Sequence, residues 1–146
     1  LSESCNIVEF SHKKIAICFK RKYDGWSFNW LRTIVMKNEG TVLLHDEVES
    51  STCLAVSQYF HFPDINLFQV GQSEAVFQMR HRDVSVKTSA PSLILNYNAA
   101  FSSHNRPILS PAIMTQHVAK TVKIDTLITL RCKPDDNPPG GPCDQI

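Results

Sequence analysis

The chain has 146 residues, of which 42% are hydrophobic and 20% are charged, and its formal net charge is +1. This length fits one globular domain with a hydrophobic core of its own. A nearly neutral chain creates no overall field that would attract nucleic acid or an anionic membrane surface, so we expect no nucleic-acid partner. No apolar run reaches the roughly 18–20 residues that a membrane-spanning helix needs.

Short apolar, β-branched and aromatic runs separated by turn residues dominate the sequence, which is typical of all-β proteins. The turn signals YDG at 23–25 and NEG at 38–40 separate the first three runs. Polar and apolar residues alternate in several later runs, which predicts half-buried strands. The expected strands cover residues 13–20, 26–36, 41–45, 66–70, 74–80, 83–88, 92–97 and 121–132.

Residues 46–60 fit two structures. Asp46 can cap a short helix with Glu47 and Glu49 in its first turn, whereas residues 52–60 also have the pattern of a strand. We therefore expect either a short helix or a strand around 46–60.

Two stretches toward the C-terminal end have the composition of irregular structure. Residues 102–111 contain two prolines and predict a loop. Residues 133–146 contain four prolines without any periodicity, which predicts an extended tail or stalk. The predicted organisation is a β-sandwich domain at 1–132 followed by a Pro/Gly-rich tail at 133–146.

Cys18 and Trp30 lie twelve residues apart on two successive expected strands, and Tyr97 follows on a later one. In an immunoglobulin-type sandwich, a cysteine on one strand and a core tryptophan on the next have about this spacing. The chain therefore resembles a divergent immunoglobulin-like domain, a V-type antiparallel β-sandwich. The resemblance implies that Cys18, Trp30 and Tyr97 belong to the structural core. A jelly roll or another Greek-key barrel would produce a similar strand pattern, and it stays open as the alternative fold.

The cysteines favour an oxidising compartment. No two of them form a C-x-x-C pair, and a secreted chain would form up to two disulfides. Ala99 stands where the immunoglobulin pattern has its second cysteine, so the resemblance leaves Cys18 to pair with Cys53 or Cys132, or to stay reduced. We expect an ectodomain in the secretory pathway, in the ER lumen or at the cell surface.

The chain combines an immunoglobulin-like pattern that lacks its second cysteine with a proline-rich tail. In both respects it resembles the immune-evasion membrane glycoproteins of cytomegaloviruses and adenoviruses. That resemblance implies a viral protein with a membrane anchor beyond the C-terminal end of this chain and an MHC class I molecule as its partner. A structural protein, such as a jelly-roll coat subunit or another self-assembling protein, is the alternative function.

The sequence contains no pattern typical of an enzyme. Its six histidines are scattered, and neither a G-x-S-x-G motif nor a phosphate-binding glycine loop occurs. We therefore expect no catalysis, no cofactor and no metal. Trp26, Phe28 and Trp30 alternate and should project from one face of their strand. Aromatic and arginine side chains often anchor protein interfaces. The candidate binding residues of this protein-recognition domain are Tyr23, Trp26, Arg80 and Arg82.

Overall fold

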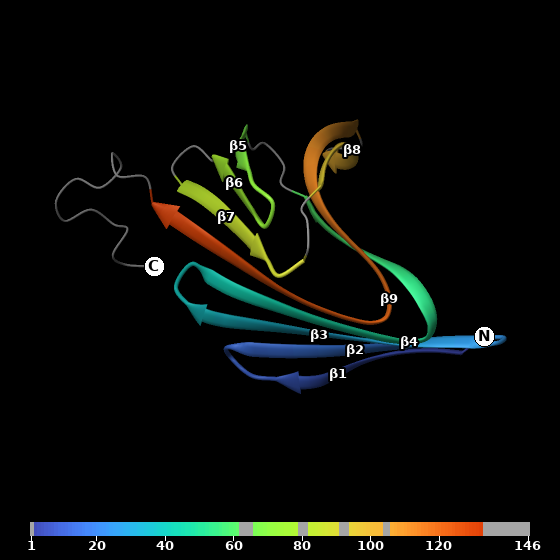
Figure 1. Cartoon of the computed structure of the whole chain (residues 1–146). Coiled ribbons are helices and arrows are strands. Elements are labelled where there is room, and N and C mark those ends of the chain that lie inside the picture. The colour runs from blue at the N-terminus through green and yellow to red at the C-terminus, as the bar shows by residue number, and fades with distance from the viewer. Residues whose placement is uncertain (1, 62–65, 79–81, 91–93, 104–105, 133–146) are drawn as a thin grey trace.

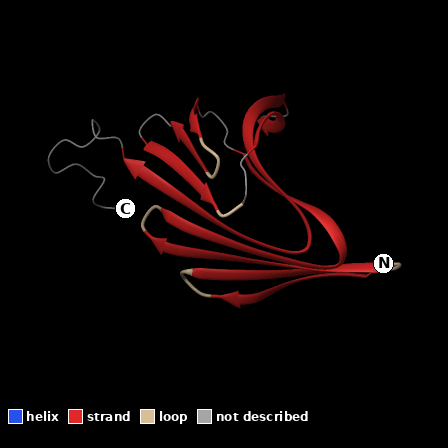
Figure 2. Cartoon of the chain, in the orientation of Figure 1, coloured by secondary structure: helices blue, strands red, loops and turns tan. Residues whose placement is uncertain are grey.

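The computed structural model describes residues 2–61, 66–78, 82–90, 94–103 and 106–132. These residues form nine β-strands, and they contain no helix (Figures 1 and 2). Within them, no helical segment is long and apolar enough to cross a membrane. The strands are β1 (Ser2–Phe10), β2 (Lys14–Tyr23), β3 (Trp26–Asn38), β4 (Thr41–His61), β5 (Asn66–Val70), β6 (Glu74–Gln78), β7 (Arg82–Thr88), β8 (Ile94–Ser103) and β9 (Arg106–Cys132).

All nine described strands belong to one antiparallel sheet. Its order is β1-β2-β3-β4-β9-β7-β6-β5, and β8 pairs with β9 off this path. The predicted all-β class is therefore confirmed. The described strands share one hydrogen-bonded sheet, whereas the predicted sandwich has two separate ones.

The β2–β3 and β3–β4 hairpins turn where the glycine signals predict. Asp24 and Gly25 connect β2 to β3, and Gly25 has a φ of 85°. Gly40, with a φ of 81°, ends the turn between β3 and β4. Residues other than glycine rarely adopt such angles, so these glycines fix the position of each turn. The β2–β3 pairing follows its turn without a register shift, whereas a shift between Met36 and Asn38 moves the β3–β4 pairing by one residue.

Of the two structures expected for residues 46–60, the strand is confirmed and the helix is not, and one other expectation about the chain path is wrong. Residues 46–60 form part of the long strand β4, because pairing with β3 and β9 satisfies their backbone groups and outweighs the local capping signal. Residues 102–111 are not a loop, since 102–103 end β8 and 106–111 begin β9. The N-terminal edge strand β1 was not predicted.

The long strands β4 and β9 bend together in the middle of their pairing. Residues 41–49 pair with 121–129, and residues 54–61 pair with 112–119. Between these two runs, four residues of β4 lie opposite the single residue Lys120 of β9. Such a bulge kinks a strand. Both strands consequently curve away from β1–β3 and lead toward β8 (Figure 1).

The bend creates an inner face, which the second half of β4 covers, and an outer face. Val56 lies in the second half of β4 and packs against Val48 in the first half of that strand, together with Val122 and Ile124 of β9. Phe60 packs in the same way against a second cluster, in which Phe77 is fully buried. The bent sheet therefore buries its core between two parts of itself.

The residues implied as an immunoglobulin core do not meet. Trp30 pairs with Phe19, and Cys18 pairs with Leu31, so the register places Cys18 on the outer face and Trp30 on the inner face. Cys18 and Cys53 are both free thiols, and the Cys18–Cys53 bridge is not formed.

Several predicted features lie outside the described residues. These are the tail at 133–146, Arg80 and the side chain of Tyr97, whose backbone lies on β8.

Candidate functional site

Aromatic side chains form a row on the inner face of β2 and β3. Because adjacent paired residues share a face, the hairpin register places Phe19 beside Trp30 and Tyr23 beside Trp26. Phe28 lies between the two tryptophans along β3. The prediction that Trp26, Phe28 and Trp30 share one face is therefore confirmed by the hairpin register and by the groove that all three line.

A groove of about 500 Å³ lies between this aromatic row and the second half of β4. Its formation follows from the bend, which turns residues 54–59 back toward the residues that precede them on the same strand. The described residues that line it are Trp26, Phe28, Trp30, Arg32, Asp46, Val48, residues 54–59, Val122 and Ile124.

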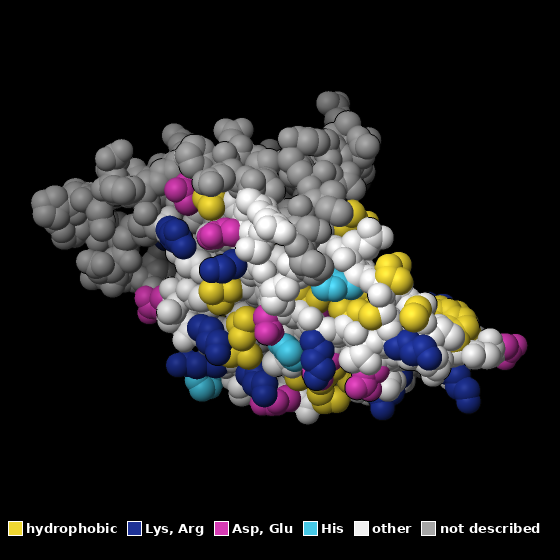
Figure 3. Space-filling model, viewed as in Figure 1, with side chains coloured by type: hydrophobic (Ala, Val, Ile, Leu, Met, Phe, Trp, Pro, Cys, Tyr) yellow, Lys and Arg dark blue, Asp and Glu magenta, His cyan; other side chains and the backbone are white. Residues whose placement is uncertain are grey.

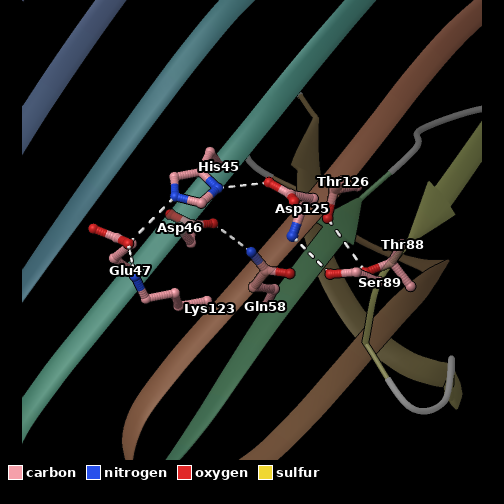
Figure 4. A network of polar contacts seen from close by, with 9 residues as sticks. All are labelled: His45, Asp46, Glu47, Gln58, Thr88, Ser89, Lys123, Asp125 and Thr126. Atoms are coloured by element: carbon pink, nitrogen blue, oxygen red, sulfur yellow. Dashed lines mark hydrogen bonds and ion pairs between the residues drawn. The ribbon is translucent and has the colours of Figure 1, made fainter.

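Asp46 is the polar centre of the groove, and its residue exposure is 3%. One carboxylate oxygen accepts hydrogen bonds from the Trp30 indole Nε1 and the Arg32 Nε, both at 2.8 Å. The other oxygen accepts a hydrogen bond from the Arg32 Nη2 at 2.9 Å and one from the Gln58 side-chain amide. Gln58 lies beyond the bend, so Asp46 links the two halves of β4 across the groove (Figure 4). The Gln58 amide oxygen in turn accepts a hydrogen bond from the Thr115 hydroxyl at 3.3 Å.

The aromatic rings pack face to face toward the hairpin end. The Tyr23 and Trp26 ring centroids are 4.1 Å apart with an interplanar angle of 13°, and those of Trp26 and Phe28 are 6.0 Å apart. The Arg21 guanidinium lies 4.8 Å from the Tyr23 ring centroid, and Arg32 lies at the same distance from Trp30. Such cation–π contacts stabilise the aromatic orientation. The groove is thus walled by rings that their neighbours hold in place.

A separate charged network lies on the outer face (Figure 4). His45 Nδ1 is 2.5 Å from an Asp125 carboxylate oxygen, and His45 Nε2 is 3.6 Å from Glu47. Lys123 forms an ion pair with Glu47. The hydrogen bond that the protonated His45 donates to Asp125 raises the pKa of His45, and Lys123 lowers the pKa of Glu47. Since these carboxylates stabilise the protonated imidazole, this network ties β4 to β9 most strongly while His45 is charged.

Charges of both signs intermingle on the face of the molecule shown in Figure 3, without an extended patch of one sign. Among the described residues, no group of three histidine, cysteine, aspartate or glutamate side chains is arranged to hold a metal ion. The groove instead combines flat apolar rings with a few fixed polar groups, an arrangement suited to binding an organic ligand.

The structure brings two of the predicted binding residues together and separates a third. Tyr23 and Trp26 form the stacked pair at the end of the β2–β3 hairpin. Arg82 lies on β7 and pairs with Cys132 of β9. In the sheet, β4 and β9 lie between β7 and the strand β3 that carries Trp26. Tyr23, Trp26 and Arg82 therefore do not form one cluster, and Arg80 is not described.

Arg32, Asp46 and Gln58 were not among the predicted binding residues, and Asp46 was considered only as a helix cap. The hairpin turn at 38–40 was not sufficient to pair Arg32 with Asp46, because a register shift between Met36 and Asn38 moves the β3–β4 pairing by one residue. Gln58 had no local signal, since it reaches Asp46 only through the bend in β4.

Comparison with known proteins identifies the fold. No protein-family model matches the chain, and no curated protein sequence matches it. Among solved structures, a heparan sulfate lyase, HepC from Pedobacter heparinus, superposes with a TM-score of 0.70 at 13% sequence identity over 90% of this chain. A heparinase III superposes with a TM-score of 0.71 at 12% identity over 92% of this chain.

The matched lengths differ between the neighbours. The chain spans 22% of the heparan sulfate lyase and 22% of the heparinase III. A GalM/aldose epimerase homologue from C. elegans also matches, with a TM-score of 0.64 at 9% identity, and there the chain spans 68% of the solved protein. These similarities establish a fold shared with β-domains of such proteins.

Proposed function

We propose that this domain binds a saccharide in the groove between the aromatic row and the second half of β4. The observation that carries the proposal is the alternation of Trp26, Phe28 and Trp30 along one wall, next to the fixed polar pair of Arg32 and Asp46. The domain would act as a binding module and would need no catalytic group of its own.

The chemistry of a sugar ring matches these groups. One face of a pyranose presents mainly C–H groups, which pack on the flat surface of an aromatic side chain, while its rim presents hydroxyls. Two of the five N–H groups of Arg32 bond to Asp46, so three can donate to the hydroxyl oxygens of a ligand. Flat apolar walls and a localised donor are what a carbohydrate site requires.

The comparisons add support of a different kind. The similar solved proteins are named as a heparan sulfate lyase, a heparinase and an aldose epimerase homologue, which all take their names from carbohydrate chemistry. In the first two, this fold is a minor part of a much longer chain. We infer that the present domain serves a larger carbohydrate-processing assembly in the same way.

Tryptophan fluorescence provides a direct test. The chain has two tryptophans, and both line the groove, so a bound sugar should change their emission. Trp26→Ala should weaken binding about tenfold, since an aromatic contact is worth roughly 1 kcal/mol beyond its buried area. Phe10→Ala is the matched control, because Phe10 is 78% exposed on the edge strand β1. Equal affinity of Trp26→Ala and the wild type would contradict the proposal.

Protein recognition is the second candidate, and the stacked column of Arg21, Tyr23 and Trp26 favours it. Arginine and large aromatic residues are enriched where interfaces gain most of their affinity. The resemblance to viral immune-evasion glycoproteins, which remains a prediction, makes MHC class I the partner to test. Purified MHC class I flowed over the immobilised domain should bind the wild type, and Tyr23→Ala should abolish the signal. A self-assembling structural protein would instead elute as large oligomers from a sizing column.

A further inference from the structure

We propose that the groove selects uncharged saccharides over saccharides that carry carboxylate or sulfate groups. This inference rests on the proposed saccharide binding and concerns the class of sugar that the groove accepts. It follows from how the charges in the groove are paired.

The charged side chains among the described residues of the groove are one arginine and one aspartate. Arg32 and Asp46 make two parallel hydrogen bonds, at 2.8 and 2.9 Å, which is the strongest geometry for such a pair. Their charges cancel at close range. The groove therefore offers no net positive charge to an incoming anion.

Asp46 also has no acceptor capacity left for a ligand. A carboxylate has about four lone-pair positions, and Asp46 accepts four hydrogen bonds, from Trp30, Arg32 and Gln58. A sugar hydroxyl cannot displace one of these donors without leaving a buried polar group unpaired. Among the charged groups of the groove, the outer edge of the Arg32 guanidinium remains available to a ligand.

An anionic sugar would lose water without gaining an unpaired cation. Its carboxylate would approach a guanidinium that a carboxylate already neutralises, so the desolvation of the ligand charge would not be repaid. Desolvating a sugar hydroxyl or ring oxygen costs much less than desolvating a carboxylate, and such an oxygen can accept hydrogen bonds from the N–H groups of Arg32 that do not bond to Asp46. Arg21, the nearest arginine on the same face of β2, lies 3.5 Å from Glu3 and does not line the groove.

The test is a fluorescence titration of the wild-type domain with neutral hexasaccharides (xylohexaose, cellohexaose and mannohexaose) and with hexagalacturonic acid. We expect at least one neutral hexasaccharide to bind at least about tenfold more tightly than the uronate, since one charge-assisted hydrogen bond accounts for that factor. The affinity for the neutral sugar should be insensitive to salt.

Two other outcomes are distinct. Tighter binding of the uronate, weakened by salt, would overturn the selectivity and leave saccharide binding intact. No emission change with any of the four sugars would overturn saccharide binding itself, and the selectivity with it.

A variant that adds an unpaired cation provides an independent check. Leu54 lines the groove beyond the bend and takes no part in the Asp46 contacts, so Leu54→Arg gives the groove a net charge of +1. The affinity for hexagalacturonic acid should rise about tenfold and become salt-dependent. Leu54→Gln is the matched control of similar size and should leave the preference for the neutral sugar unchanged. A rise of the same size in Leu54→Gln would overturn the charge argument.

Discussion

Replacing Asp46 with alanine removes the carboxylate that joins the two halves of β4. The variant loses four hydrogen bonds, and it leaves the Arg32 guanidinium without its anion. Breaking a buried ion pair from one side costs about 3–5 kcal/mol. The Arg32 side chain keeps 31% exposure and can regain water, so we expect a loss of about 3 kcal/mol in the free energy of unfolding, at the lower end of that range.

Urea denaturation followed by circular dichroism and by tryptophan emission measures this loss. Glu9→Ala is the matched control, because it removes a carboxylate that lies 2.7 Å from Lys14 in an exposed pair on β1 and β2. An exposed pair contributes less than about 1 kcal/mol. Comparing the free energies of unfolding of Asp46→Ala and Glu9→Ala therefore shows whether the loss depends on where the carboxylate lies or only on the removal of a negative charge.

A double-mutant cycle locates the effect. Arg32→Ala and the double variant with Asp46→Ala should give a coupling energy of about 2 kcal/mol, since the two side chains share two hydrogen bonds. A cost for Asp46→Ala no larger than that for Glu9→Ala, or a coupling energy near zero, would refute the role of Asp46 as the link across the groove.

Three further predictions address the core, the outer face and a turn. Phe77→Ala should lower the free energy of unfolding by about 3–5 kcal/mol in urea melts, because Phe77 is fully buried. A loss no larger than that caused by truncating an exposed side chain such as Phe10 would contradict the burial of Phe77. Asp125 raises the pKa of His45 above its ordinary value of 6.5, so the stabilisation is complete below about pH 6.5 and is lost as the pH rises through the raised value. The stability difference between wild type and His45→Gln should accordingly shrink as the pH rises from about 6.5 through the raised pKa of His45, and a difference that grew with pH would contradict the prediction. Gly40→Ala should destabilise by about 1–2 kcal/mol in thermal melts, since φ is 81° and the added Cβ would meet a backbone oxygen at 3.4 Å. Gly25→Ala, with φ of 85° and open space around it, should cost less.

The sequence predicted what local chemistry controls. Strands with regular alternation and turns with glycine at positive φ follow from nearest neighbours, and the β2–β3 hairpin was recovered together with the shared face of Trp26, Phe28 and Trp30. The capping signal at Asp46 is equally local and was misleading. A strand with partners on both sides overrides it.

Register parity shows what a spacing argument leaves out. Across the two-residue turn of the β2–β3 hairpin, paired residue numbers sum to 49, as Tyr23 and Trp26 do. Cys18 and Trp30 sum to 48 and so lie on opposite faces. The turn that the sequence predicted was sufficient to place them apart, and a spacing of twelve residues alone was not.

The second half of the groove could not be predicted for a different reason. On the C-terminal side of Lys120, the β9 residues on the inner face have even numbers, such as Val122 and Ile124. On the N-terminal side of Lys120 they have odd numbers, such as Thr115 and Ala119. Residues 112–120 gave no strand signal because the polar residues Thr115 and His117 lie on the inner face, whereas Val118 is 70% exposed on the other. The long-range pairing between β4 and β9 determines the structure of residues 112–119.

The bulge in β4 also decides how the groove can move. One wall is the second half of β4, and the other is the aromatic row on β3, which pairs with the first half of β4. Residues 50–53 therefore connect the two walls through β4. The Ser51 hydroxyl accepts a hydrogen bond from the Ser27 backbone N–H at 2.9 Å, and the Ser50 hydroxyl donates to the Ser27 carbonyl at 3.1 Å. Two independent layers can slide past each other, whereas walls joined by a continuous strand can only pivot about their connection. We therefore expect any change in the width of the groove to arise from bending at residues 50–53, next to the hydrogen bonds that hold β4 to Ser27.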